Sequence, residues 1–529
     1  MHPLKKSPRR ARFCKAAASN HHRARVTGAA LVSLTLLCAL PAADITWVGG
    51  VSGTWNTSAA NWSGASTVFT NLDNVSFTDS GLTPNPTIGV TTNPLNVGTM
   101  AVSNTSGTYT VNATSGGTLT GATLTKSGAG TLTFGQTGAI AFTNTNLQGG
   151  TLIIRQNAFT GGAINVSGNV EVGSVTAATT TLAGTTLTGS GELTFTPNGG
   201  TRMSLNADTS GFTGTLKASA SGQVNMVAAS SYTLSQAKVV LSGDTLFQGL
   251  AAGTLQIGEI TTGSANRLGY GITNASALVY QIGALNTASS IAGVIQNGGT
   301  TITNGAATGT VGLTKVGTGS LSLTGANTYT AATTVNAGTL LVGNGTSGSI
   351  ASALTVNAGA FYGNLASGNV TTAAVTIGNG AGSADSSFGA GQNVIGRFAS
   401  SSSLTLGTDA RFVFDLNSFT ETTDTVTFGG TVTLNGLFAL NDLNTGAINW
   451  SLNDSFTVLS GSSITSTFAN LADGGTIIVN GVTYLADYTG TSVTLTVTDI
   501  SPIPEPATFA TLLSMSSFAL VLFARRRRA

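Results

Sequence analysis

Residues 313–342 read LTKVGTGSLSLTGANTYTAATTVNAGTLLV, and this stretch holds the pattern that decides the fold. Apolar residues alternate with Thr and Ser in short runs such as LSLTG at 321–325, and Gly or Asn interrupts each run. A period of two with many β-branched residues indicates short strands with one buried face. Gly and Asn favour the tight turns between such strands. Similar runs fill the rest of the chain between its two ends, so we predict an all-β protein.

A second stretch at 124–154 reads LTKSGAGTLTFGQTGAIAFTNTNLQGGTLII and repeats the same layout. Both stretches carry LTK, a G-x-G two residues later, a strand, a longer turn and a final GTL strand, and GSGELTF at 189–195 is a partial third copy. This layout resembles the autotransporter-associated β-strand repeat of passenger regions and other large surface proteins. As equivalent residues of a repeat, Lys126 and Lys315 are expected to be solvated turn positions.

A finer period of about 20 residues lies beneath the repeat. TVNAG occurs at 334–338 and again at 355–359, and the next strand, AVTIGNG, follows at 374–380. A period of this length with short strands and Gly or Asn corners is typical of a solenoid. We therefore predict a right-handed parallel β-helix (β-solenoid) over residues 116–407, with about 14 coils. An array of β-sandwiches is the structural alternative, but it needs buried aromatics in each domain, and aromatics are only 6% of this chain.

The two ends of such a stack need covers, because exposed strand edges recruit other chains. We expect residues 44–115 to form an N-terminal β cap, in which Trp47, Trp55 and Trp62 plug the first coil. Stacking of these rings on sugars is the alternative. Residues 408–500 are expected to form a C-terminal β module that closes the solenoid with an antiparallel β cap.

The N-terminal segment has the features of a secretory signal peptide, assigned to residues 1–43. Residues 1–25 hold eight Lys or Arg and no acid, and an apolar run follows at 28–40. Small residues at Ala42 and Ala43 come next, so we expect cleavage after one of them.

Residues 501–529 combine a Pro-rich hinge, an apolar run at 507–524 and a basic end. The hinge contains Pro504, Glu505 and Pro506. Four arginines close the chain, namely Arg525, Arg526, Arg527 and Arg528. The run is long enough for a single transmembrane helix, with the arginines as a cytoplasmic stop.

This arrangement resembles the PEP-CTERM sorting signal of Gram-negative bacteria, with an ordinary tail anchor as the alternative. The resemblance implies that an exosortase-type sorting transpeptidase is a partner. It also implies that the membrane holds the protein by its C-terminal helix until processing.

The exported part lacks several kinds of chemistry. Both cysteines and all three histidines lie in residues 1–43, so Ser-His-Asp, Cys-His and His-based metal sites are excluded from the remainder. Of the 21 basic residues, eight lie in the leader and four at the C-terminus, which leaves nine between residues 44 and 504. The same span holds 18 of the 19 acids, so its net charge is near −9. This charge argues against binding to nucleic acid.

Candidate chemistry is sparse in the exported part. The segment GAGSADS at 380–386 weakly resembles a calcium-binding nonapeptide, but that motif works in tandem copies, so no metal and no cofactor are predicted. Glycoside hydrolysis needs two facing carboxylates, and sequence places no two acids across a cleft, so no catalytic residue is predicted. The densest acid cluster comprises Asp415, Glu421, Asp424, Asp442 and Asp454.

The favoured function is that of a non-enzymatic cell-surface or extracellular-matrix protein with a structural or adhesive role. Association with extracellular polysaccharide is implied only by the resemblance to sorting-signal proteins. The expected route runs through an inner-membrane-anchored intermediate to the cell surface, outer membrane or extracellular matrix of a Gram-negative bacterium. A polysaccharide lyase or glycosidase on a β-helix is the alternative, because that fold hosts such enzymes.

Overall fold

The computed structural model describes residues 42–501, with internal gaps at 83–86, 114–116, 138, 156–158, 175–178, 198–201, 220–221, 227–231, 272–275, 299–308, 344–347, 358, 365–372, 381–385, 392 and 445. The described residues form β-strands and one 3₁₀ turn, η1 (Asp79–Gly81), and contain no α-helix. The predicted all-β class is therefore confirmed. Among these residues, no helix has the length and apolar character needed to cross a membrane. The predicted signal peptide, apart from residues 42 and 43, and the predicted membrane helix lie outside them.

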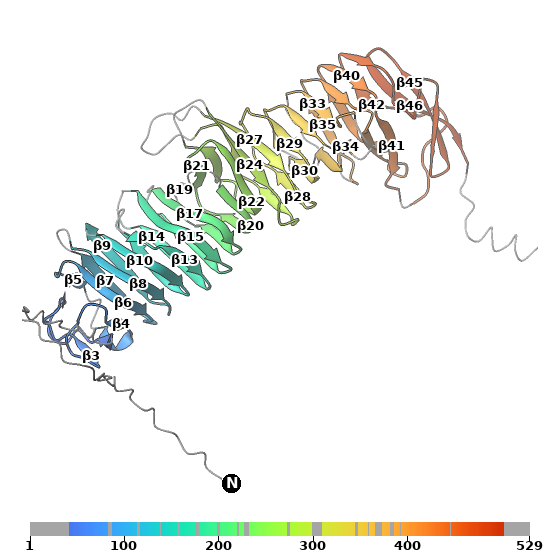
Figure 1. Ribbon diagram of the computed structural model, residues 1–529. Coiled ribbons are helices and arrows are strands. Elements are labelled where there is room, and N and C mark those ends of the chain that lie inside the picture. The colour runs from blue at the N-terminus through green and yellow to red at the C-terminus, as the bar shows by residue number, and fades with distance from the viewer. Residues whose placement is uncertain are drawn as a thin grey trace, which may run out of the picture. The chain divides into compact units, whose positions relative to one another are not determined.

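The first long sheet has 14 strands, and nearly all of them pair in parallel with strands from the neighbouring coils (Figure 1). Its members are β1 (Asp44–Trp47), β3 (Trp62–Gly64), β4 (Asn74–Phe77), β6 (Leu95–Val102), β8 (Leu119–Lys126), β10 (Ile140–Leu147), β12 (Phe159–Thr160), β13 (Ala163–Val166), β15 (Thr180–Gly189), β17 (Arg202–Phe212), β19 (Gly222–Met226), β21 (Thr245–Gly249), β23 (Arg267–Tyr270) and β26 (Val294–Ile295). Only the β1–β3 pair is antiparallel.

The second long sheet continues the stack past the end of the first. One row of its strands comprises β2 (Thr54–Trp55), β5 (Thr87–Val90), β7 (Thr108–Ala113), β9 (Thr131–Thr137), β11 (Gly150–Ile154), β14 (Asn169–Ser174), β16 (Glu192–Thr196), β18 (Thr215–Ala218), β20 (Tyr232–Leu241), β22 (Gly253–Thr262), β25 (Ser289–Ile291), β28 (Ser320–Leu323), β30 (Gly338–Val342), β32 (Ala360–Asn364), β34 (Ser386–Gly389), β37 (Ala410–Asn417), β38 (Thr422–Thr423) and β41 (Leu437–Asp442). A second row comprises β24 (Ala277–Ile282), β27 (Thr310–Lys315), β29 (Thr333–Val335), β31 (Leu354–Val356), β33 (Val375–Ile377), β36 (Leu404–Leu406), β40 (Thr431–Leu434) and β43 (Ser463–Thr465).

A third sheet of six strands covers the C-terminal part. It comprises β35 (Arg397–Ser400), β39 (Thr425–Phe428), β42 (Ser455–Ser460), β44 (Thr476–Val479), β45 (Val482–Tyr488) and β46 (Ser492–Ile500). The pairs β42–β46, β44–β45 and β45–β46 are antiparallel, whereas β35–β39 is parallel. The chain thus ends its parallel stacking at β43 and finishes in antiparallel strands.

The whole parallel stack is a β-solenoid of about 13 turns. Parallel pairing begins at β1 with β4 and reaches β40 with β43, so it runs through residues 44–115 and well into 408–500. Coil length varies along the stack. Paired threonines are 21 residues apart from Thr355 to Thr376 and 29 apart from Thr376 to Thr405. The predicted period near 20 therefore applies to some coils, and the coil from Thr376 to Thr405 is longer because it also contains β35 of the third sheet. The hand of the coil stays a prediction.

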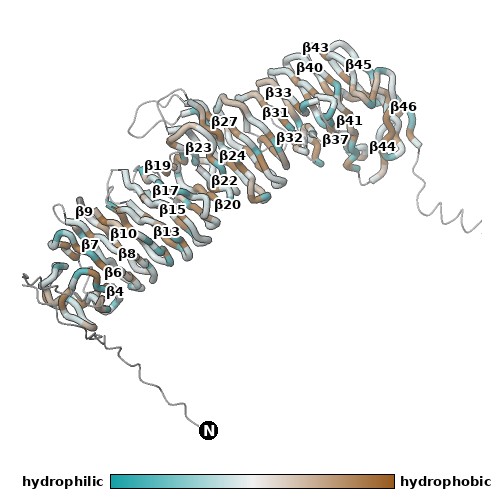
Figure 2. The backbone as a smooth tube through the Cα atoms, in the orientation of Figure 1, coloured by the Kyte–Doolittle hydropathy of each residue, from teal (hydrophilic) through white to brown (hydrophobic). Residues whose placement is uncertain are grey.

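Many strands alternate between buried and partly exposed residues, and Figure 2 shows hydrophobic and hydrophilic residues interspersed along the coils. In β7, Tyr109, Val111 and Ala113 are fully buried, and the Thr and Asn residues between them face outward. Each coil thereby stacks its Val, Leu and Ile on the next coil and exposes a polar row. The buried apolar residues of the described coils form one continuous cluster along the stack.

Candidate functional site

The most regular surface feature is a single file of threonines along β27, β29, β31, β33, β36, β40 and β43. The file comprises Thr314, Thr334, Thr355, Thr376, Thr405, Thr433 and Thr465, each paired in register with the next. In six of these strands the residues on both sides of the threonine are buried, so the threonine side chain points outward, and Thr465 at the end of β43 is itself exposed. We call this set the threonine column.

Most hydroxyls of the threonine column are available to a ligand. Thr433 and Thr465 share a hydrogen bond between their Oγ1 atoms at 3.1 Å. The side chains of Thr355, Thr376 and Thr405 make no hydrogen bond to another described residue, and they are partly or fully exposed. A parallel stack spaces these hydroxyls about 4.8 Å apart. The column therefore offers one donor and acceptor per coil in a straight row.

The outer face of the first coils carries a different polar row. Thr46, Ser76, Thr125, Asn146 and Asn165 occupy equivalent register positions in β1, β4, β8, β10 and β13, with Ala101 of β6 between the second and third. Thr46 and Ser76 are hydrogen-bonded at 2.7 Å between their hydroxyl oxygens.

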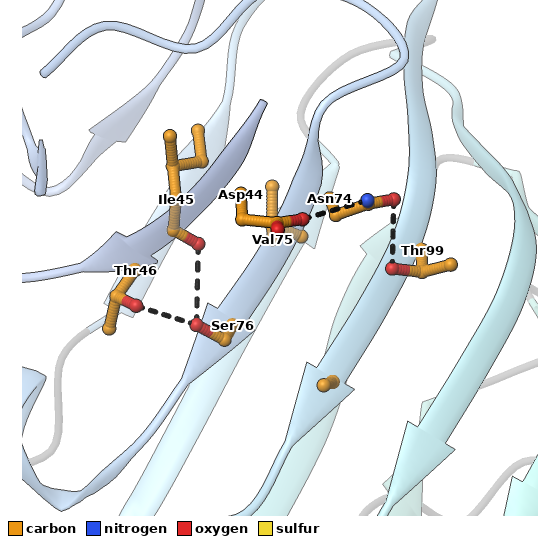
Figure 3. Close-up of a pocket in the computed structure, with 8 residues that line it drawn as sticks. Asp44, Ile45, Thr46, Asn74, Val75, Ser76 and Thr99 are labelled. Atoms are coloured by element: carbon orange, nitrogen blue, oxygen red, sulfur yellow. Dashed lines mark hydrogen bonds between the residues drawn. The ribbon is translucent and has the colours of Figure 1, made fainter. Parts of the chain in front are cut away.

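A shallow hollow of about 270 Å³ lies at the start of this face, lined by residues of β1, β4 and β6 (Figure 3). Asn74 Nδ2 donates to Asp44 Oδ1 at 2.9 Å, and Thr99 Oγ1 donates to Asn74 Oδ1 at 3.0 Å. Ser76 Oγ also donates to the Ile45 carbonyl at 3.3 Å. The hollow is open and has both apolar and polar lining residues, and hydrogen bonds among these residues occupy its polar side chains, so we place the candidate surface on the threonine column.

The three N-terminal tryptophans form a plug. Trp47, Trp55 and Trp62 are 0–2% exposed. Trp62 lies edge-on to Trp47 at 5.1 Å and to Trp55 at 5.2 Å between ring centroids, and Phe69 and Phe77 complete the cluster. A ring without an exposed face cannot stack on a sugar, so this geometry fits the plug and argues against sugar stacking at these residues.

The expectation that the two repeat lysines are solvated is wrong. Lys126 and Lys315 are fully buried and are not solvated turn residues. Lys126 Nζ donates to the carbonyls of Ser127, Gly128 and Gly149 at 2.7, 2.9 and 3.2 Å. Because Gly149 lies in the next coil, this ammonium ties two coils together at a corner.

The second copy repeats this arrangement. Lys315 Nζ donates to the carbonyls of Val316, Gly317 and Ala337 at 2.6, 2.7 and 3.1 Å. Three carbonyl acceptors satisfy the three N–H donors of an ammonium group. Burial lowers the pKa of both lysines to about 8. With every donor occupied and no exposure, the lysines have a structural role in the corner.

Glycine at the neighbouring corner position is required by the same geometry. Gly150 and Gly338 both have positive φ, at 75° and 68°. A Cβ on Gly150 would lie 2.2 Å from the Gly128 carbonyl oxygen and 2.5 Å from Lys126 Nζ. The lysine, the G-x-G turn and the glycine of GTL are therefore one structural unit, repeated in both copies.

The acid cluster contains two buried carboxylates. Asp415 and Asp424 are each 1% exposed. Asp424 accepts the backbone N–H groups of Gly396 and Asp415 at 2.7 and 2.9 Å, and Asn441 Nδ2 donates to Asp415 Oδ1 at 2.9 Å. Burial raises the pKa of Asp424 to about 7 and also raises the pKa of Asp415. These groups are enclosed by neighbouring backbone and hold it together through their hydrogen bonds.

The other acids of the cluster lie at turns. Asp442 accepts the N–H and hydroxyl of Ser418 at 3.0 and 2.6 Å, and Asp454 accepts the Ser451 N–H at 2.6 Å. Glu421 is exposed at a position with φ of 54°. No group of three or more His, Cys, Asp or Glu in the described part of the chain is placed to hold a metal ion.

The predicted sorting residues lie outside the described residues. They are Pro504, Glu505, Pro506, Arg525, Arg526, Arg527 and Arg528. Most of the GAGSADS segment at 380–386 is also outside them.

Comparison with known proteins identifies the repeat. A family model described as the passenger-associated transport repeat matches residues 124–154 and 313–342, which confirms the resemblance at both predicted copies. No curated protein matches the chain significantly. The repeat and the parallel β-solenoid together indicate an exported, surface-exposed protein of the passenger type from a Gram-negative bacterium.

Proposed function

We propose that this chain is a non-enzymatic structural or adhesive protein of the cell surface, and that its threonine column makes weak, repeated contacts with extracellular polysaccharide. The observation that carries this proposal is the unbroken register of the column over seven coils. A row of weak hydrogen-bonding groups gains affinity when one long ligand engages many of them together. A polysaccharide is such a ligand, because its hydroxyls recur along an extended chain.

The proposed route to the surface follows the sequence features of the two ends. A signal peptide directs export, and the Pro504-Glu505-Pro506 motif is the recognition site of an exosortase-type transpeptidase. The apolar run at 507–524 forms a transmembrane helix that anchors the intermediate in the inner membrane, with Arg525 to Arg528 on the cytoplasmic side. Processing then releases the solenoid to the outside.

The proposal includes the absence of catalysis. A lyase or glycosidase needs acid and base groups that reach the substrate. Asp424 instead accepts two buried backbone amides, and Asp415 accepts the Asn441 side-chain amide. Lys126 and Lys315 are enclosed by carbonyls. The enzymatic alternative has no observation of its own in its favour.

Incubation with polysaccharide tests both parts of the proposal. The protein recovered from the surface of its producing cells is mixed with their exopolysaccharide and run on size-exclusion chromatography with light scattering. Movement of the protein into the polysaccharide peak at constant polysaccharide mass is the expected result. A polysaccharide mass that falls with time would establish an enzyme. If the protein and the polysaccharide elute separately and both keep their mass, the proposed contact between them is wrong.

A further inference from the structure

The start of β1 is hydrogen-bonded to the carboxylate of Asp73, which has neutral donors but no positively charged partner among the described residues. The backbone nitrogen of Ala43 lies 2.9 Å from Asp73 Oδ1, and the Ala43 carbonyl accepts the Asn74 N–H at 2.8 Å. The other oxygen of the Asp73 carboxylate, Oδ2, accepts the Thr70 N–H at 2.8 Å. Asp73 is 5% exposed. Its carboxylate is thus oriented, with Oδ1 directed at residue 43.

No cation balances this carboxylate among the described residues. Ion pairs among the described residues join Lys217 to Glu192, Lys238 to Glu259 and Arg267 to Asp244, and none of these involves Asp73. A nearly buried carboxylate with only neutral donors is costly, and a positive charge within hydrogen-bond distance removes much of that cost. Two nitrogens lie at that distance, those of Thr70 and Ala43, and of these the Ala43 nitrogen becomes an ammonium group if the chain is cleaved just before it.

We propose that export cleaves the Ala42–Ala43 peptide bond and that Asp73 binds the new α-ammonium group of Ala43. Hydrolysis consumes one water, leaves Ala42 as a carboxylate on the released leader, and leaves Ala43 with a free amine that is protonated at neutral pH. The neutral N–H···O contact becomes a charge-assisted hydrogen bond at the same site, which is about twice as strong. This inference rests on the proposed export.

The geometry distinguishes between the two small residues at the predicted cleavage site. Cleavage after Ala43 would remove the donor to Asp73 Oδ1 and the acceptor of the Asn74 N–H. Two polar groups at the first coil would then lose their partners. Cleavage after Ala42 keeps both contacts and places a positive charge beside the Asp73 carboxylate.

The first measurement is the intact mass and the N-terminal peptide of the protein recovered outside its producing cells. A chain that begins at Ala43 is expected. An exported chain that begins at Asp44, or at any other residue, overturns the inference and leaves the proposed export intact. Recovery only in the cytoplasm with residues 1–42 attached contradicts the proposed function and removes the basis of this inference.

The second measurement is the pKa of the Ala43 α-amine in the exported protein. It is obtained from the pH dependence of reductive methylation of that amine, detected by mass spectrometry. Contact with a carboxylate is expected to raise it by about one unit above the ordinary value near 8. In the Asp73→Asn variant it should return to the ordinary range. The Asp44→Asn variant is the matched control, because Asp44 is adjacent in the chain but bonds to the Asn74 side chain. Equal effects of the two substitutions, or no effect of Asp73→Asn, would overturn the assignment of Asp73.

Discussion

Replacing Lys315 by Met tests whether the buried lysines hold the coils together. Methionine fills most of the space of the lysine stem but has no donors, so the carbonyls of Val316, Gly317 and Ala337 lose their partner. Each buried carbonyl left without a donor costs about 1–3 kcal/mol, and relaxation of the corner recovers part of this. Removing one side of a buried charged network typically costs about 3–5 kcal/mol. We expect a loss of about 3 kcal/mol, near the lower bound, because the corner lies next to solvent.

The assay must be local, because a solenoid need not unfold in one step. Hydrogen exchange measured by mass spectrometry on peptides from β27 to β30 reports the local opening free energy. A loss of about 3 kcal/mol corresponds to amide exchange more than a hundredfold faster. Peptides from β6 to β10, several coils away, should exchange at the same rate as in the unsubstituted protein.

Lys217→Met is the matched control on the same solenoid. Lys217 lies 2.6 Å from Glu192, but their side chains are 37% and 29% exposed. A surface ion pair of this kind contributes about 0–1 kcal/mol, so exchange around β16 and β18 should change less than about fivefold. If Lys315→Met changed local exchange no more than this control, the lysine would not be a structural tie between coils.

Three further predictions follow from other buried groups. Because burial raises the pKa of Asp424 to about 7, the folded chain holds a proton that the unfolded chain releases near pH 4, so stability falls as pH rises through 7. Denaturation at several pH values should show this slope in the unsubstituted protein and lose it in Asp424→Asn. Because burial lowers the pKa of Lys126 and Lys315 to about 8, the unfolded chain binds more protons between pH 8 and 10.5, and stability should rise with pH in that window. The same titration on the Lys126→Met, Lys315→Met double variant should lack that rise. Trp62→Ala should lower the free energy of unfolding of the first coil by about 3–5 kcal/mol. The checks are the melting temperature and the fluorescence of the remaining tryptophans. A spectrum that stays blue-shifted together with an unchanged melting temperature would contradict the role of Trp62 in the plug.

Much of the fold could be predicted from the sequence because solenoid strands carry their own pattern. Alternation in segments such as 321–325 gave the inward and outward faces, and both repeat copies were located at the residues that the family model matches. Coil length was harder to predict, since a coil can gain a strand that belongs to another sheet. The coil between Thr376 and Thr405 gains β35 of the third sheet in this way.

The lysine corners were misread although the sequence held the signal. Lys126 follows Leu124 by two residues in β8, and a period of two places both on the same, buried face. Treating the G-x-G turn as a solvated loop concealed this. The contacts of Asp424 had no such signal, because its two backbone donors come from Gly396 and Asp415, which only the folded coils bring beside it.

The threonine column is the surface proposed to contact polysaccharide, and its hydroxyls can be removed without changing the shape of the strands. Thr355, Thr376 and Thr405 lie at its middle, and valine is close in shape to threonine and well suited to a strand. Each hydroxyl contributes about 0.5–1.5 kcal/mol where it bonds a ligand, so the triple Val variant should bind polysaccharide at least about tenfold more weakly.

The most direct test is the affinity of this triple variant for the exopolysaccharide of the producing cells. It is compared with a control that carries Thr483→Val, Thr494→Val and Thr496→Val on the antiparallel strands β45 and β46. We expect weaker binding for the column variant alone, with an unchanged melting temperature in both variants. Equal affinity of the column variant, the control and the unsubstituted protein would contradict the proposed contact with polysaccharide.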